Sequence, residues 1–206
     1  RQPINGVILG ISLADMMTLD AAGRAAHAIE IRNRLDEIRQ ILRIAFPVYV
    51  LFTKADLVSG FMQYFGSFDE VRRREVWGAT FQTSGRTQNM VGAVRPEFDA
   101  LIERLAAEVP DRLQEEADPA DRVALFAFCA QMEALKERLA AFLDDVFDPA
   151  RPRADATMRG FYFSSGTQEG TPIDQMLGAL GRGFGRQAEE HLSGSGKSFF
   201  LHDLLA

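Results

Sequence analysis

The chain has 206 residues, 47% of them hydrophobic, and a formal net charge of −6 at pH 7. This length and composition allow one large domain or two small ones with a real hydrophobic core. The net negative charge argues against nucleic acid as a main partner, because proteins that bind nucleic acid need a basic patch on their surface. One cysteine excludes an internal disulfide framework, and no apolar run is long enough to span a bilayer.

Three short apolar runs predict buried strands of a parallel sheet. They cover residues 5–13, 46–52 and 158–163. Between the first two, Ile31, Leu35, Ile38 and Leu42 recur at helical spacing and predict an amphipathic helix over 20–44, with Asp20 as its cap. Strand, helix and strand form a βαβ unit with parallel strands.

The middle of the chain has a helical composition. Residues 61–77 predict one or two short helices and 80–94 a loop, and Pro96 opens a further helix. Asp118 is expected to cap a helix that runs to about Phe147, with apolar positions Val123, Phe126, Leu135, Leu139 and Phe142. Cys129, beside Phe126, Phe128 and Met132, is expected to be a small core residue rather than a nucleophile. A stop follows at 148–152.

The end of the chain is expected to return to the body of the domain. A helix is predicted after Pro172 and a short amphipathic helix over 199–205. The expected fold class is α/β, with about three parallel strands and a large helical insertion. Its division is 1–60 with 155–206 for the α/β part, and 61–154 for the insertion.

The second strand runs into Thr53-Lys54-Ala55-Asp56, which resembles the base-reading motif of GTPases, [N/T]KxD. Ligands of open α/β sheets bind at the carboxyl ends of strands, where this motif falls. In GTPases the aspartate accepts hydrogen bonds from guanine, and the lysine stem lies along the purine. Alternatively, Lys54 and Asp56 cap the following helix and fix the loop.

Three segments in order carry a wider resemblance: 3–8 (PINGVI), 46–56 (FPVYVLFTKAD) and 159–174 (RGFYFSSGTQEGTPID). Together they resemble the cytoplasmic NTPase-like region of the IcmF/TssM family, large inner-membrane proteins of the bacterial type VI secretion system. The resemblance covers essentially the whole chain. It implies the later half of a P-loop GTPase-like sheet, on the cytoplasmic side, held to the membrane only by segments outside this chain. TssL-like inner-membrane proteins and baseplate components are the implied partners.

The resemblance also implies where a nucleotide base would bind. Thr53, Lys54 and Asp56 align with the base-reading motif, and Ser164 and Ser165 with the loop that supports it. In the family the P-loop lies upstream of this chain, so GTP or ATP with Mg²⁺ is implied only for the complete domain, and no catalytic residue is expected here.

Two further patterns imitate nucleotide motifs. Gly194-Ser195-Gly196-Lys197-Ser198 ends like a P-loop, but His191 occupies the first glycine position. Asp20-Ala21-Ala22-Gly23 matches DxxG, but we interpret it as a helix start.

Other polar groups have ordinary interpretations. His27, His191 and His202 lack ligand spacing, so no metal site is expected. Glu115-Glu116 and Asp144-Asp145 are interpreted as solvated helix faces. The cluster Arg72-Arg73-Arg74 is interpreted as an exposed face, with contact to an acidic partner as the alternative.

Three functional hypotheses follow from these observations. The leading hypothesis is a structural and interaction module of the secretion scaffold, with the helical insertion as its docking surface. The alternative is an NTPase domain that energises or regulates secretion. A GTPase of translation or signalling is a third, weaker hypothesis. The first strand is expected to be an apolar sheet edge that this chain, a neighbour or further sequence covers.

Overall fold

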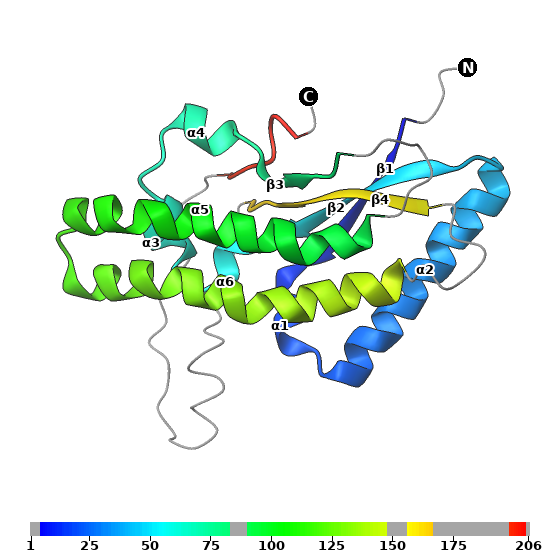
Figure 1. Ribbon diagram of the computed structural model, residues 1–206, viewed down its shortest axis with the longest axis horizontal. Helices are drawn as coiled ribbons and strands as arrows, with labels where there is room; N and C mark the ends of the chain where they lie inside the picture. The colour runs from blue at the N-terminus through cyan, green and yellow to red at the C-terminus, as the bar shows by residue number, and fades with distance from the viewer. Residues whose placement is uncertain (1–4, 83–89, 148–155, 167–197, 205–206) are drawn as a thin grey trace.

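The computed structural model describes residues 5–82, 90–147, 156–166 and 198–204. Within these residues, one sheet has the strand order β1-β2-β4-β3 (Figure 1). Its strands are β1 Val7–Ser12, β2 Phe46–Thr53, β3 Trp77–Thr80 and β4 Ala156–Phe163. β1, β2 and β4 are parallel, whereas β3 is antiparallel to β4. The three predicted strands are confirmed, and β3 is a fourth.

Helices connect these strands and form the second layer. They are α1 Leu13–Thr18, α2 Ala21–Leu42, α3 Phe61–Phe65, α4 Glu70–Arg74, α5 Val94–Glu115 and α6 Pro119–Val146, with 3₁₀ turns η1 Ala55–Leu57 and η2 Val91–Ala93. α2 joins parallel β1 and β2, as the βαβ unit requires. Its predicted cap is confirmed, because the Asp20 carboxylate accepts a hydrogen bond from the Gly23 N–H at 2.7 Å.

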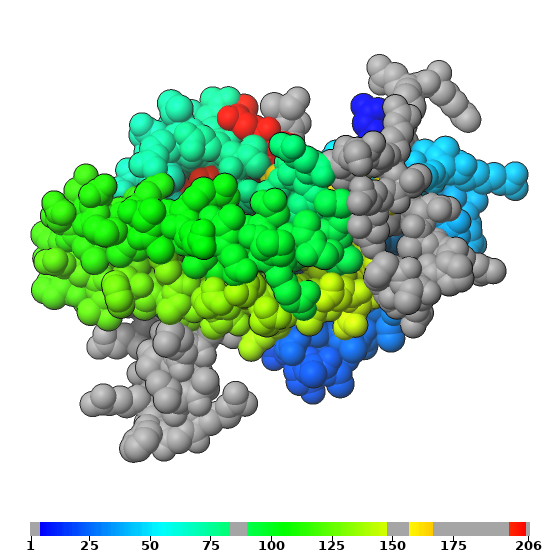
Figure 2. Space-filling model, viewed as in Figure 1, coloured from blue at the N-terminus to red at the C-terminus, as the bar shows by residue number. Residues whose placement is uncertain are grey.

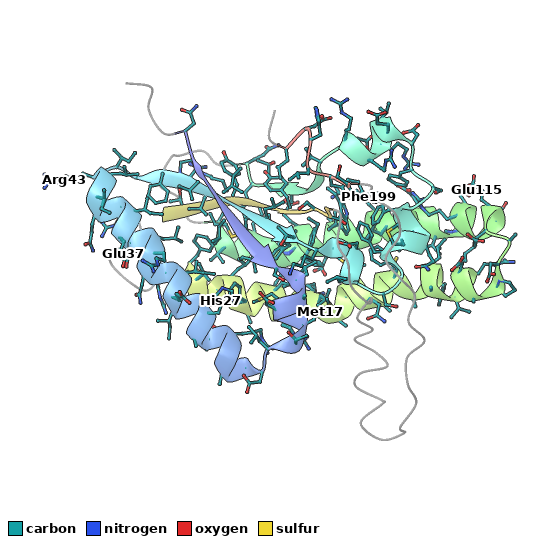
Figure 3. All side chains as sticks on the ribbon, turned by 180° about the vertical axis from the view of Figure 1, so that it is seen from behind. Met17, His27, Glu37, Arg43, Glu115 and Phe199 are labelled. Carbon is teal, nitrogen blue, oxygen red and sulfur yellow. The ribbon has the colours of Figure 1, made fainter. Side chains whose placement is uncertain are left out.

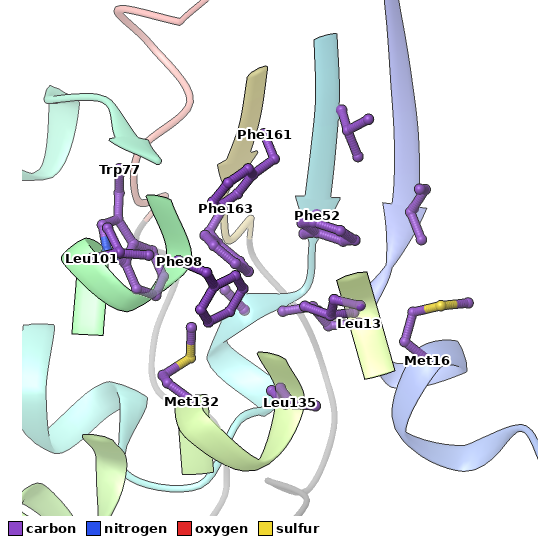
Figure 4. Packing of buried hydrophobic residues seen from close by; sticks show 14 of the residues in the cluster. Leu13, Met16, Phe52, Trp77, Phe98, Leu101, Met132, Leu135, Phe161 and Phe163 are labelled. Atoms are coloured by element: carbon purple, nitrogen blue, oxygen red, sulfur yellow. The ribbon is translucent and has the colours of Figure 1, made fainter. Parts of the chain in front are cut away.

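The three long helices α2, α5 and α6 lie on one face of the sheet, and α6 contacts both of the others (Figure 1). Phe52, Phe161 and Phe163 point from the strands into this layer (Figure 4). Phe98 of α5 stacks on Phe161 with ring centroids 5.6 Å apart. Burying a side chain of this size contributes roughly 1.5–3 kcal/mol to the free energy of folding. These aromatic contacts therefore stabilise the packing of the helices on the sheet.

The opposite face of the sheet is less filled. Ile8, Tyr49, Leu51 and Tyr162 line a hollow of about 340 Å³, with Leu204 at its border. β1 is an edge strand, since it pairs with β2 and no other described strand, and Ile8 is 49% exposed. The described residues therefore do not supply the cover expected for this edge.

β3 corrects the expectation for the segment 61–77. The two short helices are present as α3 and α4, but Trp77 begins a strand. Buried Trp77 and Ala79 alternate with Gly78 and exposed Thr80, but four residues that include a glycine are a weak strand signal. Pairing with β4, with Trp77 opposite Phe163, defines this strand. β3 lies within 61–154, and the proposed division into two parts stays a prediction.

The helix predicted over 199–205 is wrong for the described residues 199–204. Phe200 has a left-handed φ of 59°, which ends any helix, and its N–H donates to the Arg73 carbonyl at 2.6 Å. The predicted packing against the body is confirmed, because Phe199 and Phe200 are both buried.

The helix capped by Asp118 is confirmed as α6, but two of its apolar positions do not reach the core. Leu135, Leu139 and Phe142 are buried, whereas Val123 and Phe126 are 69% and 68% exposed. Leu125 and Phe128 occupy the inward face there, and their neighbours along the helix must point elsewhere. The stop at 148–152 and the helix after Pro172 lie outside the described residues.

Candidate functional site

The motif Thr53–Asp56 forms the turn that ends β2. Lys54 adopts a left-handed conformation with φ of 62°, and its carbonyl accepts from the Leu57 N–H at 3.1 Å. This directs the chain into η1, where Asp56 is 2% exposed. The Thr53 hydroxyl lies 3.4 Å from the Ile11 carbonyl of β1 as a weak donor. The residues that resemble a base-reading motif are thus placed at the carboxyl end of the sheet.

The loop after β4 lies directly beside this turn. The Ser164 N–H donates to the Phe52 carbonyl at 2.9 Å, and the Ala55 N–H donates to the Ser164 carbonyl at 3.0 Å. Parallel β2 and β4 end at the same edge of the sheet, which explains the proximity. The structure therefore brings together the two segments that the sequence pairs, as a backbone-bonded unit.

The side chains of this unit are largely withdrawn from solvent. Ser164 and Ser165 are buried, like Asp56, while Thr53 and Lys54 are half-buried. The Ser165 hydroxyl donates to the Gly166 carbonyl at 3.1 Å. A carboxylate accepts hydrogen bonds from ring N–H groups, so Asp56 is the acceptor that base recognition would use. With 2% of its surface exposed, the Asp56 side chain is closed to a ligand in this arrangement.

A second cluster, which the sequence did not predict, joins α3, β3 and the C-terminal stretch. Phe61, Phe65, Trp77 and Phe200 form a continuous aromatic group, with the rings of Phe65 and Trp77 4.9 Å apart and those of Trp77 and Phe200 5.4 Å apart. Phe128 of α6 packs against the Phe65 and Trp77 rings of this cluster. No periodicity could reveal this cluster, since its members come from segments up to 139 residues apart, from Phe61 to Phe200.

The arginines Arg72, Arg73 and Arg74 lie beside this aromatic cluster, and two of them contact rings that border it, Phe68 and Phe199. The Arg72 guanidinium lies 3.9 Å from the ring centre of Phe68, and Arg73 lies 5.9 Å from that of Phe199. Arg74 is 3.7 Å from the Asp203 carboxylate. Such contacts contribute about 0.5–1 kcal/mol each at exposed sites. Arg72 also lies 3.5 Å from the Glu108 carboxylate of α5.

The remaining candidates form no second site. In the part of the chain that the structure describes, no three His, Cys, Asp or Glu side chains gather as metal ligands. His27 packs on Phe142 with ring centroids 5.7 Å apart. Cys129 packs half-buried against the core, and burial raises the pKa of its thiol, which disfavours the reactive thiolate. His191 and the residues 194–197 lie outside the described residues.

The described helices do not include one that is long and apolar enough to cross a membrane. Figure 3 shows the side chains on the ribbon, with Glu37 on the long α2 and Arg43 at its C-cap. These features describe an α/β domain with a mostly parallel sheet and a long helical hairpin, α5 and α6.

Comparison with known proteins identifies the family of this domain. The sequence matches the model of the IcmF-related N-terminal domain over residues 1–206, so the chain belongs to this family. It is 42% identical over 208 residues to the type VI secretion system component TssM1 of Pseudomonas aeruginosa PAO1. That match covers 99% of this chain but 19% of the relative. No solved structure matches the fold significantly.

Proposed function

We propose that this domain is a structural and interaction module of a type VI secretion membrane complex, and that the α5–α6 hairpin is its contact surface. The observation that carries the proposal is the form of this hairpin. Its helices, of 22 and 28 residues, pack along each other and extend past the end of the sheet (Figure 1). Figure 2 shows α5 and α6 side by side on one broad face of the molecule, and many of their side chains are exposed.

Ion pairs between the two helices hold this hairpin together. Arg95 of α5 binds both Glu137 and Asp144 of α6, at 3.1 and 2.8 Å, and Lys136 binds Asp99 at 2.6 Å. A rigid surface loses little conformational entropy when it binds. This suits a scaffold, whose partners need a preformed face. TssL-like inner-membrane proteins and baseplate components are the proposed partners, with this domain on the cytoplasmic side of the bacterial inner membrane.

Charge reversal on the outer side of α5 tests this function. Glu103→Arg in the full-length parent protein is expected to reduce co-purification with the TssL-like or baseplate components at least tenfold. The side chain is exposed, so the melting temperature should change by less than about 2 °C. Glu37→Arg on α2 is the control and should retain the partners. If Glu103→Arg and Arg104→Glu, tested as two separate variants, both retain all partners, the hairpin is not the contact surface.

A nucleotide-binding domain is the second candidate function, because Thr53, Lys54 and Asp56 lie beside Ser164 and Ser165 at the carboxyl ends of adjacent strands. GTP or ATP with Mg²⁺ would bind only in a complete domain that also contains a P-loop. Hydrolysis would then energise or regulate secretion.

Titration of fluorescent GTP and ATP analogues tests this candidate on a longer stretch of the parent protein that includes the upstream segment. Saturable binding that Asp56→Ala abolishes, and Asp69→Ala retains, would favour the nucleotide-binding domain. Asp69 caps α4 on the surface and provides a matched loss of one carboxylate. Absence of binding at high micromolar protein would contradict the nucleotide-binding function, and the scaffold function would be the remaining candidate.

A further inference from the structure

An exposed apolar stripe runs along the outer face of α6. Val123 and Phe126 are more than two-thirds exposed, Ala130 and Ala134 are exposed, and Ala127 is half-buried. Phe126, Ala127, Ala130 and Ala134 follow Val123 by three, four, seven and eleven residues, so all five positions share one helix face. A single exposed apolar side chain is ordinary, but two large ones joined by alanines form a continuous patch.

Opposite charges stand at the two ends of this stripe. Arg122 is exposed at the N-terminal end. Glu133 lies at the other end with 53% of its side chain exposed, although it also binds Lys136 at 2.6 Å. Eleven residues make three helical turns, or about 16 Å, and return to the same side of the helix. The stripe therefore has a positive end and a negative end on one face.

We propose that α6 packs antiparallel against α6 of a second copy of this chain, around a two-fold axis level with Ala127 and Phe128. In this register Arg122 of each copy faces Glu133 of the other. Phe126 of each copy lies over Ala130 of the other, so that a large side chain meets a small one. A two-fold axis satisfies both ends at once, because the interface is self-complementary. A parallel pair would place Arg122 beside Arg122 and Phe126 against Phe126.

This surface uses the hairpin to which the proposed function assigns other partners, but it does not depend on that function. A single pair of helices buries less than the roughly 1,600 Å² of a standard interface. The dimer is therefore weak, with a Kd on the order of 10–100 μM. Each copy carries a net charge of −6, so physiological salt is needed to screen the repulsion.

Sedimentation equilibrium of the 206-residue chain at 5–500 μM and 0.15 M salt tests the proposal. We expect a monomer–dimer equilibrium that Phe126→Asp weakens at least tenfold. Phe126 is exposed, so this change should leave the melting temperature unaltered. Val71→Asp is the control, because Val71 is an exposed apolar residue on α4, away from α6, and this variant should dimerise normally. A chain that stays monomeric at 500 μM overturns the proposal.

The register has a sharper test. Arg122→Glu and Glu133→Arg should each weaken the dimer at least threefold, since like charges then face each other across the axis. The two changes in one chain restore opposite charges and should restore the dimer. If the double variant is no tighter than the single ones, the antiparallel register is wrong. If Phe126→Asp loses a secretion component while the wild type is monomeric, the proposed function survives and this inference does not.

Discussion

At the residue scale, Tyr64 shows how a polar group is accommodated in the core. Its hydroxyl donates to the Leu105 carbonyl at 2.8 Å, which links α3 to α5. The Arg112 guanidinium lies 4.2 Å from the Tyr64 ring centre and donates to the Tyr64 carbonyl at 2.9 Å. Burial raises the pKa of Tyr64 to about 12, and the nearby Arg112 opposes this increase. Tyr64 is therefore held as a neutral phenol.

The raised pKa of Tyr64 predicts a loss of stability in alkali. Its ordinary value is 10.0, so the unfolded chain ionises first as pH rises, and folding stability falls between about pH 10 and 12. The full effect is roughly 3 kcal/mol. Tyr64→Phe should cost about 1 kcal/mol at pH 7, where it loses the hydrogen bond, but show a flatter decline above pH 10.

Urea unfolding at pH 7 to 11.5 measures this difference. Tyr49→Phe, on the opposite face of the sheet, controls for the loss of one phenol. Parallel pH profiles of the wild type and Tyr64→Phe would show that Tyr64 ionises in the folded state as readily as in the unfolded chain.

At the element scale, helix boundaries follow from local chemistry. The Asp118 carboxylate accepts from the backbone N–H groups of Ala120 and Asp121 at 2.7 and 3.3 Å, and Pro119 occupies the first turn. Both features were visible in the sequence, because a cap acts within four residues. In α5, Pro110 lies inside the helix without ending it. The packing of α5 on α6 compensates for the hydrogen bond that proline removes there.

The cap at Asp118 gives a prediction for α6. Asp118→Ala leaves two N–H groups without their acceptor and should reduce the free energy of unfolding by about 1 kcal/mol. Chemical denaturation followed by circular dichroism measures the change. Asp111→Ala is the control, since Asp111 is exposed inside α5 and should change stability by less than about 0.5 kcal/mol. Equal effects of the two substitutions would show that the cap contributes nothing specific.

At the scale of the whole molecule, residues 198–204 connect separate parts of the domain. Phe199 forms a two-way backbone bridge with Ser165, at 2.9 and 3.1 Å, next to the candidate base site. Its ring meets Phe61 edge-on, with centroids 5.5 Å apart. Phe200 and Asp203 bind the backbone of α4 through the carbonyls of Arg73 and Arg74. One stretch near the C-terminus thus links the sheet, α3 and α4.

Loss of the Phe199 ring should therefore affect the whole domain. Phe199→Ala empties a buried position and is expected to cost about 3–5 kcal/mol, with a single cooperative transition at lower denaturant. His202→Ala removes an exposed neighbour that contacts Arg74 and should cost less than about 1 kcal/mol. A loss below about 1 kcal/mol for Phe199→Ala would mean that the C-terminal stretch adds little to the fold.

The sequence by itself determined the features that depend on neighbours along the chain. Apolar runs defined β1, β2 and β4, helical spacing defined α2 and α6, and Asp20 and Asp118 marked helix starts. The sequence motifs also predicted the IcmF/TssM family, and the match to the IcmF-related N-terminal domain confirms this prediction. They paired Thr53–Asp56 with Ser164–Ser165, and the structure places these segments side by side. Whether they bind a base stays a prediction.

Only the tertiary structure decided what depends on contacts between distant segments. Trp77 to Thr80 became a strand because β4 offered a free edge, and Phe200 left the helical conformation because it is held by Arg73 and the aromatic cluster. The exposure of Val123 and Phe126 depends on where the neighbouring elements contact α6. The spacing of apolar residues predicts which of them share a helix face. Whether that face is buried depends on which other elements the fold packs against it.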